Sequence, residues 1–149
     1  EALNAFTKEN IKVTSSSGKV QENCDNGQGC TSLKNIREEV VNYVVDVNKL
    51  CGSQGCGITI TAGTESGHKE GEVSHGTGDK VDIRSRDPVT GQSTAITEQI
   101  RTSSRFQRLP DNPSRGEEIY RDRVTDAIWV LEGSNQNSTP HWDVTLPRR

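Results

Sequence analysis

Two short segments near the C-terminus constrain the fold more than any other part of the sequence. Residues 125–132 and 141–146 both have the pattern of β-strands, and the eight residues between them are rich in turn formers. We therefore expect these strands to form a hairpin, with Glu132 at the end of one strand opposite His141 at the start of the other. Because side chains alternate along a strand, Trp142 points to the face opposite His141 and is expected in the core.

The preceding part of the chain shows both helical and strand periodicities. Apolar residues recur at spacings of three and four within residues 31–50 and again within 93–106, which predicts two helices. Alternation in residues 57–62 and a short apolar run at 80–83 predict two strands, whereas the two prolines in 109–116 indicate a loop. The order helix, strand, strand, helix, strand, strand is typical of an α+β fold with a small, mainly antiparallel sheet.

The composition fits one folded domain with an extension at its N-terminus. The chain has 149 residues, enough for a single core, but only 29% of them are hydrophobic. Residues 1–23, which include the polar run Thr14-Ser-Ser-Ser-Gly18, are predicted to be a flexible linker or N-terminal extension. The folded domain is then expected to occupy residues 24–149. Because the chain starts at Glu1 and contains no Met, we expect a processed product or an excised domain.

The charge pattern argues against two classes of partner. The net charge is -3, and the 18 basic and 21 acidic residues are interspersed, so that no basic face for nucleic acid is visible. No apolar run is long enough to span a membrane, and no signal peptide is visible. We expect a domain that is monomeric and binds neither nucleic acid nor the interior of a membrane.

Four cysteines fall into two close pairs, Cys24 with Cys30 and Cys51 with Cys56. Two local disulfides are the favoured interpretation, and they would indicate an oxidising compartment. The alternative is a zinc site made of all four thiolates, although structural zinc sites usually have tighter spacings than these.

Three residues have the chemistry of a hydrolytic metal site. His75 and Asp82 are seven positions apart, and Gly76 and Gly78 between them permit a tight turn. His141 opens the last predicted strand and could lie beside Asp82 in the same sheet. Two histidines and one carboxylate form a common zinc ligand set that leaves a coordination position for water. The alternative for each histidine is a solvated loop residue.

The pattern His75-x-x-Gly78-x-x-x-Asp82 resembles the SxHxxGxAxD signature of the zinc D-Ala-D-Ala carboxypeptidase and endopeptidase family, which shares its fold with the hedgehog signalling domain. The resemblance covers about residues 31–146, and Pro140-His141-Trp142 is similar to the family's last ligand motif. It implies a Zn²⁺ ion held by His75, Asp82 and His141. It also implies cleavage of peptidoglycan peptides by an extracellular, periplasmic or virion-associated protein, as in phage lysins.

The chain departs from the family pattern at four places. Val73 replaces the signature's Ser, with Ser74 one place later, and Lys80 replaces its Ala. Gly63-Thr-Glu65 stands where the family has an Arg that receives the substrate carboxylate, which favours an endopeptidase over a carboxypeptidase. Ser138 occupies the usual position of the general base.

Another carboxylate must therefore act as the base if the chain is an enzyme. Glu132 is the best candidate because the hairpin brings it opposite His141. Asp143 is the alternative, but it lies deeper in the sheet on the face of His141. His68 is a candidate donor to the oxyanion of the transition state. Two other functions remain open: a non-catalytic zinc-containing module of the same fold that binds a cell wall or a protein, and a structural domain without a metal.

Overall fold

The computed structural model describes residues 2–14, 19–21, 30–33, 35–63, 78–112, 117–133 and 140–148. The helices of this part of the chain are α1 (Ala2–Lys8), α2 (Glu38–Asn48), the short 3-10 turn η1 (Lys49–Cys51) and α3 (Ala95–Thr102). Its strands are β1 (Lys12–Val13), β2 (Lys19–Gln21), β3 (Cys30–Ser32), β4 (Thr59–Ala62), β5 (Lys80–Arg84), β6 (Phe106–Asn112), β7 (Glu117–Asp122), β8 (Ile128–Glu132) and β9 (His141–Thr145).

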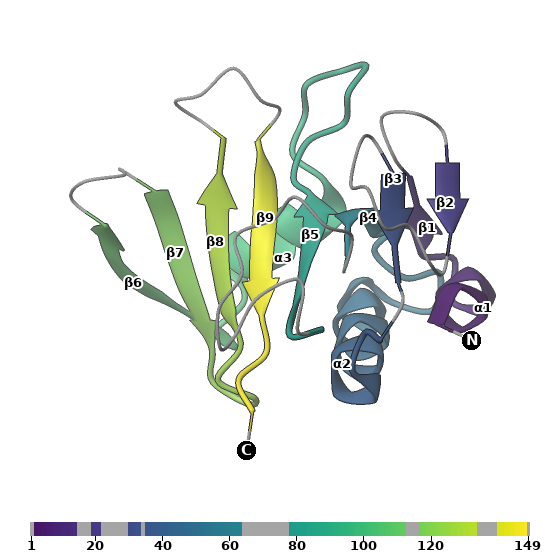
Figure 1. Ribbon diagram of the computed structural model, residues 1–149. Helices are drawn as coiled ribbons and strands as arrows, with labels where there is room; N and C mark the ends of the chain where they lie inside the picture. Colours follow the sequence, from purple (N-terminus) through teal and green to yellow (C-terminus); the bar gives the residue numbers. More distant parts are fainter. Residues whose placement is uncertain are drawn as a thin grey trace.

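Seven of these strands form one sheet in the order β1-β4-β5-β9-β8-β7-β6 (Figure 1). Only β1 and β4 are parallel within this sheet, and the other neighbouring strands are antiparallel. β2 and β3 form a separate parallel pair. The predicted α+β class with a mainly antiparallel sheet is confirmed, although the sheet is larger than the sequence suggested.

One face of the large sheet carries the core. Trp129 of β8 and Trp142 of β9 are 0% exposed and lie at alternating positions of their strands. The indole nitrogen of Trp129 donates to the hydroxyl of Tyr43 in α2 at 2.9 Å, and that of Trp142 donates to Thr97 Oγ1 in α3 at 2.8 Å. Both helices therefore cover the tryptophan face, and each large ring finds a partner for its only polar atom. The prediction that Trp142 is a core residue is confirmed.

Helix α2 is the first predicted helix, but it begins at Glu38 and not near residue 31. Asn35 has a positive φ of 62°, which no helix interior tolerates, and the backbone N–H of Arg37 donates to Gly78 O at 3.3 Å. Thr31 and Ser32, at the predicted start of the helix, belong to β3. Two acidic residues in the first turn, Glu38 and Glu39, interact favourably with the positive end of the helix dipole.

The first residues of the chain are part of the fold, which corrects the prediction of a flexible linker for this stretch. Residues 2–14 form α1 and β1, and β1 extends the sheet by pairing with β4. Phe6 is 0% exposed and Ile11 is 2% exposed, both within the hydrophobic core. Ala2, Leu3, Ala5 and Val13 also pack against the core. Because α1 has only seven residues, its apolar pattern is too short to predict a helix from the sequence.

The predicted loop at 109–116 is also wrong in its first half, because β6 extends to Asn112. Pro110 lies inside this strand, which is possible because β6 is at the edge of the sheet and a proline there removes no ladder hydrogen bond that the sheet needs. The following strand β7, Glu117–Asp122, continues the sheet beyond the predicted hairpin.

Cys51 and Cys56 form a disulfide, as the local pairing predicts. The alternative of a zinc site made of four thiolates is wrong, since these two sulfur atoms are bonded to each other. Cys24 lies outside the described residues, so its pairing with Cys30 stays a prediction.

Candidate metal centre

Three neighbouring strands, β5, β9 and β8, position the candidate site on the face of the sheet that is opposite to the core. Val81 and Ile83 are 0% exposed and point to the helices, so alternation places Lys80, Asp82 and Arg84 on the other face. In the sheet register, Glu132 is paired with His141. The facing of Glu132 and His141, predicted from the hairpin, is confirmed.

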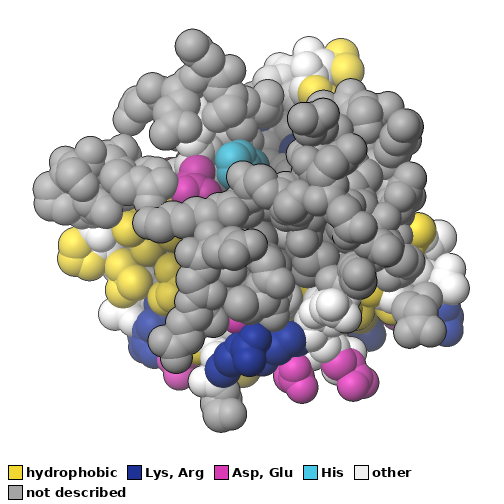
Figure 2. Space-filling model, viewed as in Figure 1, with side chains coloured by type: hydrophobic (Ala, Val, Ile, Leu, Met, Phe, Trp, Pro, Cys, Tyr) yellow, Lys and Arg dark blue, Asp and Glu magenta, His cyan; other side chains and the backbone are white. Residues whose placement is uncertain are grey.

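The side chains of Asp82, Glu132 and His141 converge at this point. The Nε2 atom of His141 lies 3.5 Å from Asp82 Oδ2 and 3.6 Å from Glu132 Oε1. One ligand atom from each of the three residues lies within 4.8 Å of the other two. Figure 2 shows histidine and acidic side chains together at the surface, near the upper ends of β8 and β9.

The spacing of these atoms fits a shared metal ion. Two atoms that each lie about 2.0–2.2 Å from a tetrahedral zinc ion are roughly 3.4 Å apart. The distances of 3.5 and 3.6 Å match this value. An imidazole nitrogen with carboxylate oxygens is also a donor set that zinc accepts, although other divalent cations share it. The group can therefore hold a metal ion.

Asp143 makes the neighbourhood strongly acidic. It is paired with Asp82 in the register of β5 and β9, and its Oδ1 atom is buried without a hydrogen-bond partner among the described residues. Its Oδ2 atom lies 3.6 Å from Lys80 Nζ. Burial, followed by the charge of Asp82, raises the pKa of Asp143 to about 6. The carboxylates of Asp82, Glu132 and Asp143 lie close together here, and such a group of negative charges favours the binding of a positive ion.

Arg84 is a neighbour of the site that the sequence did not single out as such. It is paired with His141 across β5 and β9 and is half-buried on the same face. Side chains alternate between the two faces of β5, so Arg84 lies on the same face as Asp82, two residues earlier. The missing information was the register of β5 against β9, which pairs Arg84 with His141 across nearly 60 residues of sequence and leaves no local signal.

The backbone just before β5 is held firmly in place. Gly78 has φ +82°, and a Cβ atom built there would lie 2.4 Å from the backbone oxygen of Asn35, so only glycine fits. Asp79 is 0% exposed, and its Oδ1 atom lies 2.6 Å from Arg37 Nε and 2.9 Å from Arg148 Nε. These contacts fix the start of β5 and, with it, the position of Asp82.

The predicted site residues thus have different outcomes. Asp82, Glu132 and His141 meet in the structure, and Asp143 lies beside them on the same face, as expected. The predicted third ligand, His75, and the predicted oxyanion donor, His68, lie outside the described residues, as do Val73, Ser74 and Ser138. Their roles stay predictions.

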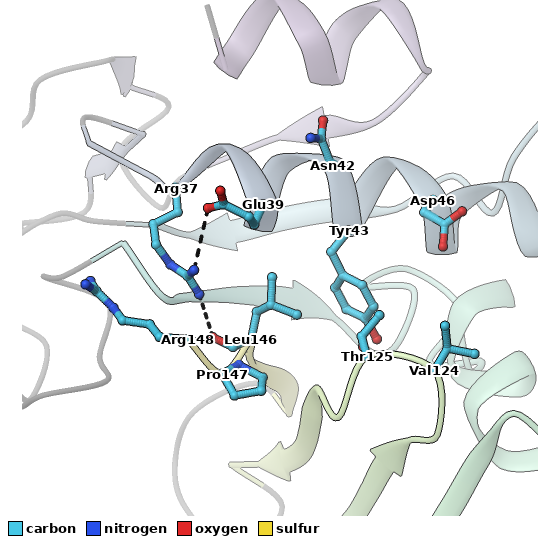
Figure 3. Close-up of a pocket in the computed structure, with 10 residues that line it drawn as sticks. All are labelled: Arg37, Glu39, Asn42, Tyr43, Asp46, Val124, Thr125, Leu146, Pro147 and Arg148. Carbon is cyan, nitrogen blue, oxygen red and sulfur yellow. Dashed lines mark hydrogen bonds and ion pairs between the residues drawn. The ribbon is translucent and has the colours of Figure 1, made fainter.

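A separate pocket lies at the other end of β9 (Figure 3). It has a volume of about 700 Å³ and is bordered by α2, by the β7–β8 turn and by the segment that follows β9. Arg37 crosses its edge and donates to Leu146 O at 2.7 Å, which ties this segment to α2. Its lining mixes both charges with apolar groups and does not indicate one kind of ligand.

Comparisons with known proteins do not identify a relative: no protein-family model, no curated protein and no solved structure matches the chain. Among the described residues, no helix is long and apolar enough to cross a membrane.

Proposed function

We propose that the chain is a zinc-dependent peptidase that cleaves stem or cross-bridge peptides of peptidoglycan, as an endopeptidase more than as a carboxypeptidase. The convergence of Asp82, Glu132 and His141 on the face opposite to the core is the observation that supports this proposal most. It is the constellation that a metal-assisted hydrolase needs: ligands for an ion and a carboxylate beside them.

In the proposed site His75, Asp82 and His141 hold the zinc ion. When bound, zinc polarises the scissile carbonyl and so favours the attack of water on its carbon. Glu132 accepts a proton from the attacking water and returns it to the nitrogen of the departing amine, so that no net proton is gained or lost. The carboxylate of Glu132 lies 3.6 Å from the His141 imidazole, near enough to serve a reaction at the ion.

A second candidate function rests on the same carboxylate. Glu132 Oε1 and Asp82 Oδ2 lie at nearly equal distances from His141 Nε2. Glu132 could therefore be a fourth ligand, which would close the site as in structural zinc centres. The chain would then be a non-catalytic zinc-containing module that binds a cell wall or a protein.

The substitution Glu132→Gln separates the two candidates. If Glu132 is the base, the variant keeps its zinc affinity but clears a suspension of purified peptidoglycan at least about 100-fold more slowly, the scale of general acid–base catalysis. If Glu132 is a ligand, the zinc affinity falls and the unmodified protein does not lyse the wall. Glu98→Gln, an exposed glutamate of α3, is the matched control and should change neither quantity.

We propose an exported protein, placed outside the cell, in the periplasm or on a virion. The Cys51–Cys56 disulfide supports this proposal, because such bonds persist mainly in oxidising compartments.

A further inference from the structure

Three apolar side chains form a row across β6, β7 and β8. Leu109 is paired with Ile119, and Ile119 is paired with Val130, so the three residues lie at one level of the sheet. Each of them is half-buried. Directly paired residues project from the same face of an antiparallel sheet, so the three side chains are neighbours. We call these three residues the apolar row.

The apolar row does not belong to the core. Its neighbours along the strands, Tyr120, Trp129 and Leu131, are buried on the helix-covered face, so alternation directs Ile119 and Val130 the other way. None of the three side chains belongs to the core or to the partly buried residues packed against it. Figure 2 shows apolar side chains over β6, β7 and β8, next to the acidic and histidine side chains.

The apolar row adjoins the candidate metal centre formed by Asp82, Glu132 and His141. Val130 is paired with Asp143, and Asp143 is paired with Asp82. Val130 also precedes Glu132 by two residues on β8 and shares its face. A molecule bound along the row would therefore reach the candidate ligands and the candidate base without leaving the sheet surface.

Polar residues lie next to the apolar row on β6 and β7, two positions away from Leu109 and Ile119. Gln107 and Arg121 are paired there, and the Arg121 guanidinium donates to Gln107 Oε1 at 3.2 Å and also binds Asp126. Arg121 is thus engaged by its neighbours. Leu109, Ile119 and Val130 are all uncharged, and Arg121 is engaged at the border of the row. A charged side chain placed over Leu109 and Ile119 would therefore lose water without gaining a partner from these three residues.

The length of the row fits a short stretch of extended peptide. Adjacent strands are about 4.8 Å apart, which places Leu109 roughly 10 Å from Val130. An extended chain advances about 3.3 Å per residue, so a peptide that crosses these strands has about three residues over the row. Because its side chains alternate, two of them can contact the sheet.

We infer that the apolar row is the part of the site that recognises substrate side chains. The inference rests on the proposed peptidase function. The substrate is a peptide with uncharged, apolar side chains on the residues that lead away from the scissile bond, and the two side chains that face the sheet pack on the row between Val130 and Leu109. Cross-bridges made of glycine alone have no side chains for the row, so peptides with apolar side chains are the better substrates.

The test compares cleavage of blocked synthetic peptides by the zinc-loaded protein. Each position flanking the central bond holds Leu, Ala, Gly, Ser, Asp or Lys, in the L or the D configuration, and mass spectrometry identifies the bond that is cut. We expect preference for Leu and Ala over Ser, Asp and Gly on one side of that bond. Val130→Thr exchanges a methyl for a hydroxyl group at nearly constant shape, and it should lower kcat/KM for the preferred peptide about tenfold while the zinc content stays the same.

Binding gives a readout that does not depend on turnover. The affinity of the Glu132→Gln protein for the preferred peptide, measured by calorimetry, should fall by a similar factor when Val130→Thr is added. Val89→Thr, at an exposed valine outside the sheet, is the control and should have no effect. Cleavage that ignores the side chains, or that is unchanged in Val130→Thr, overturns the inference alone. Absence of cleavage for every peptide and for peptidoglycan overturns it together with the proposed function.

Discussion

Asp122 and Asp143 belong to two charged clusters on opposite faces of the same sheet, and the surroundings of these two aspartates differ. On the helix-covered face, Asp122 is 0% exposed and every side of its carboxylate is occupied. Arg105 Nε and Val124 N donate to its Oδ1 atom at 2.9 Å each, and Tyr43 donates to its Oδ2 atom at 2.6 Å. On the other face, Asp143 has a buried oxygen without a hydrogen-bond partner among the described residues and lies beside Asp82.

The pKa values move in opposite directions for this reason. Burial alone would raise the pKa of Asp122, but the hydrogen bonds from Arg105 and Tyr43 outweigh it and the pKa is lowered. The pKa of Asp143 is raised to about 6 by burial and by the charge of Asp82. The carboxylate of Asp122 has the hydrogen-bond partners that stabilise a fold. The second cluster brings the carboxylates of Asp82, Glu132 and Asp143 together, and the ion pair of Asp143 with Lys80 at 3.6 Å does not prevent the rise in its pKa. Neighbouring carboxylates with a raised pKa are typical of functional sites, including those that bind a cation.

Removal of the satisfied carboxylate should have the largest effect on stability. Asp122→Ala leaves the guanidinium of Arg105 without its main partner inside the protein, and we expect the free energy of unfolding to fall by about 3 kcal/mol, measured by urea denaturation. The estimate lies at the low end for buried pairs because Arg105 retains Asp46 at 3.4 Å.

Asp46→Ala removes the exposed partner of the same arginine and is the matched control. We expect it to cost less than about 1 kcal/mol, as for other surface ion pairs. Equal losses in the two variants would contradict the assignment of Asp122 as the central partner of Arg105.

The free energy of unfolding should depend on pH through the lowered pKa of Asp122. Because the pKa of Asp122 is lower in the folded chain, its contribution is present above the unfolded pKa, near 4, and is lost as the pH falls through the folded pKa. The difference in unfolding free energy between the unmodified protein and Asp122→Asn should therefore shrink below about pH 4, by at most roughly 1.4 kcal/mol per pH unit. A difference that stays constant down to pH 2.5 would show that Asp122 is not perturbed.

Replacing Asp143 by Asn should raise the free energy of unfolding, whereas replacing Asp122 by Asn should lower it. Asp143→Asn removes one of the negative charges that lie together on β5, β8 and β9, so the metal-free protein at pH 8 should become more stable by about 1 kcal/mol. Urea denaturation in the presence of a chelator measures this change. Destabilisation would mean that the ion pair with Lys80, at 3.6 Å, matters more than the repulsion from Asp82.

The hairpin shows how much of the fold and the site could be predicted from the sequence. Alternation in β8 and β9 was sufficient to place Trp142 in the core and to bring Glu132 opposite His141, because both facts depend on local periodicity and a short connection. The pairing of β9 with β5, which adds Asp82 to the site, was expected from the resemblance and from the chemistry of the ligands rather than from any pattern.

The parts that were missed have physical reasons of their own. Pro110 concealed the strand β6, since a proline indicates a loop unless the strand lies at an edge. The apolar row could not be predicted without the register of β6, β7 and β8, because its members come from three separate segments. Phe6 joins the core from a stretch in which polar residues outnumber apolar anchors.

The most direct test of the account is calorimetric titration of zinc into the metal-free protein, compared with three histidine variants. The account predicts tight binding of close to one Zn²⁺ per chain, a large loss of affinity in His141→Ala and in His75→Ala, and unchanged affinity in His68→Ala. Tight zinc binding that persists in His141→Ala, or a protein that takes up no zinc at all, would contradict the claim that Asp82, His141 and their neighbours form a metal centre.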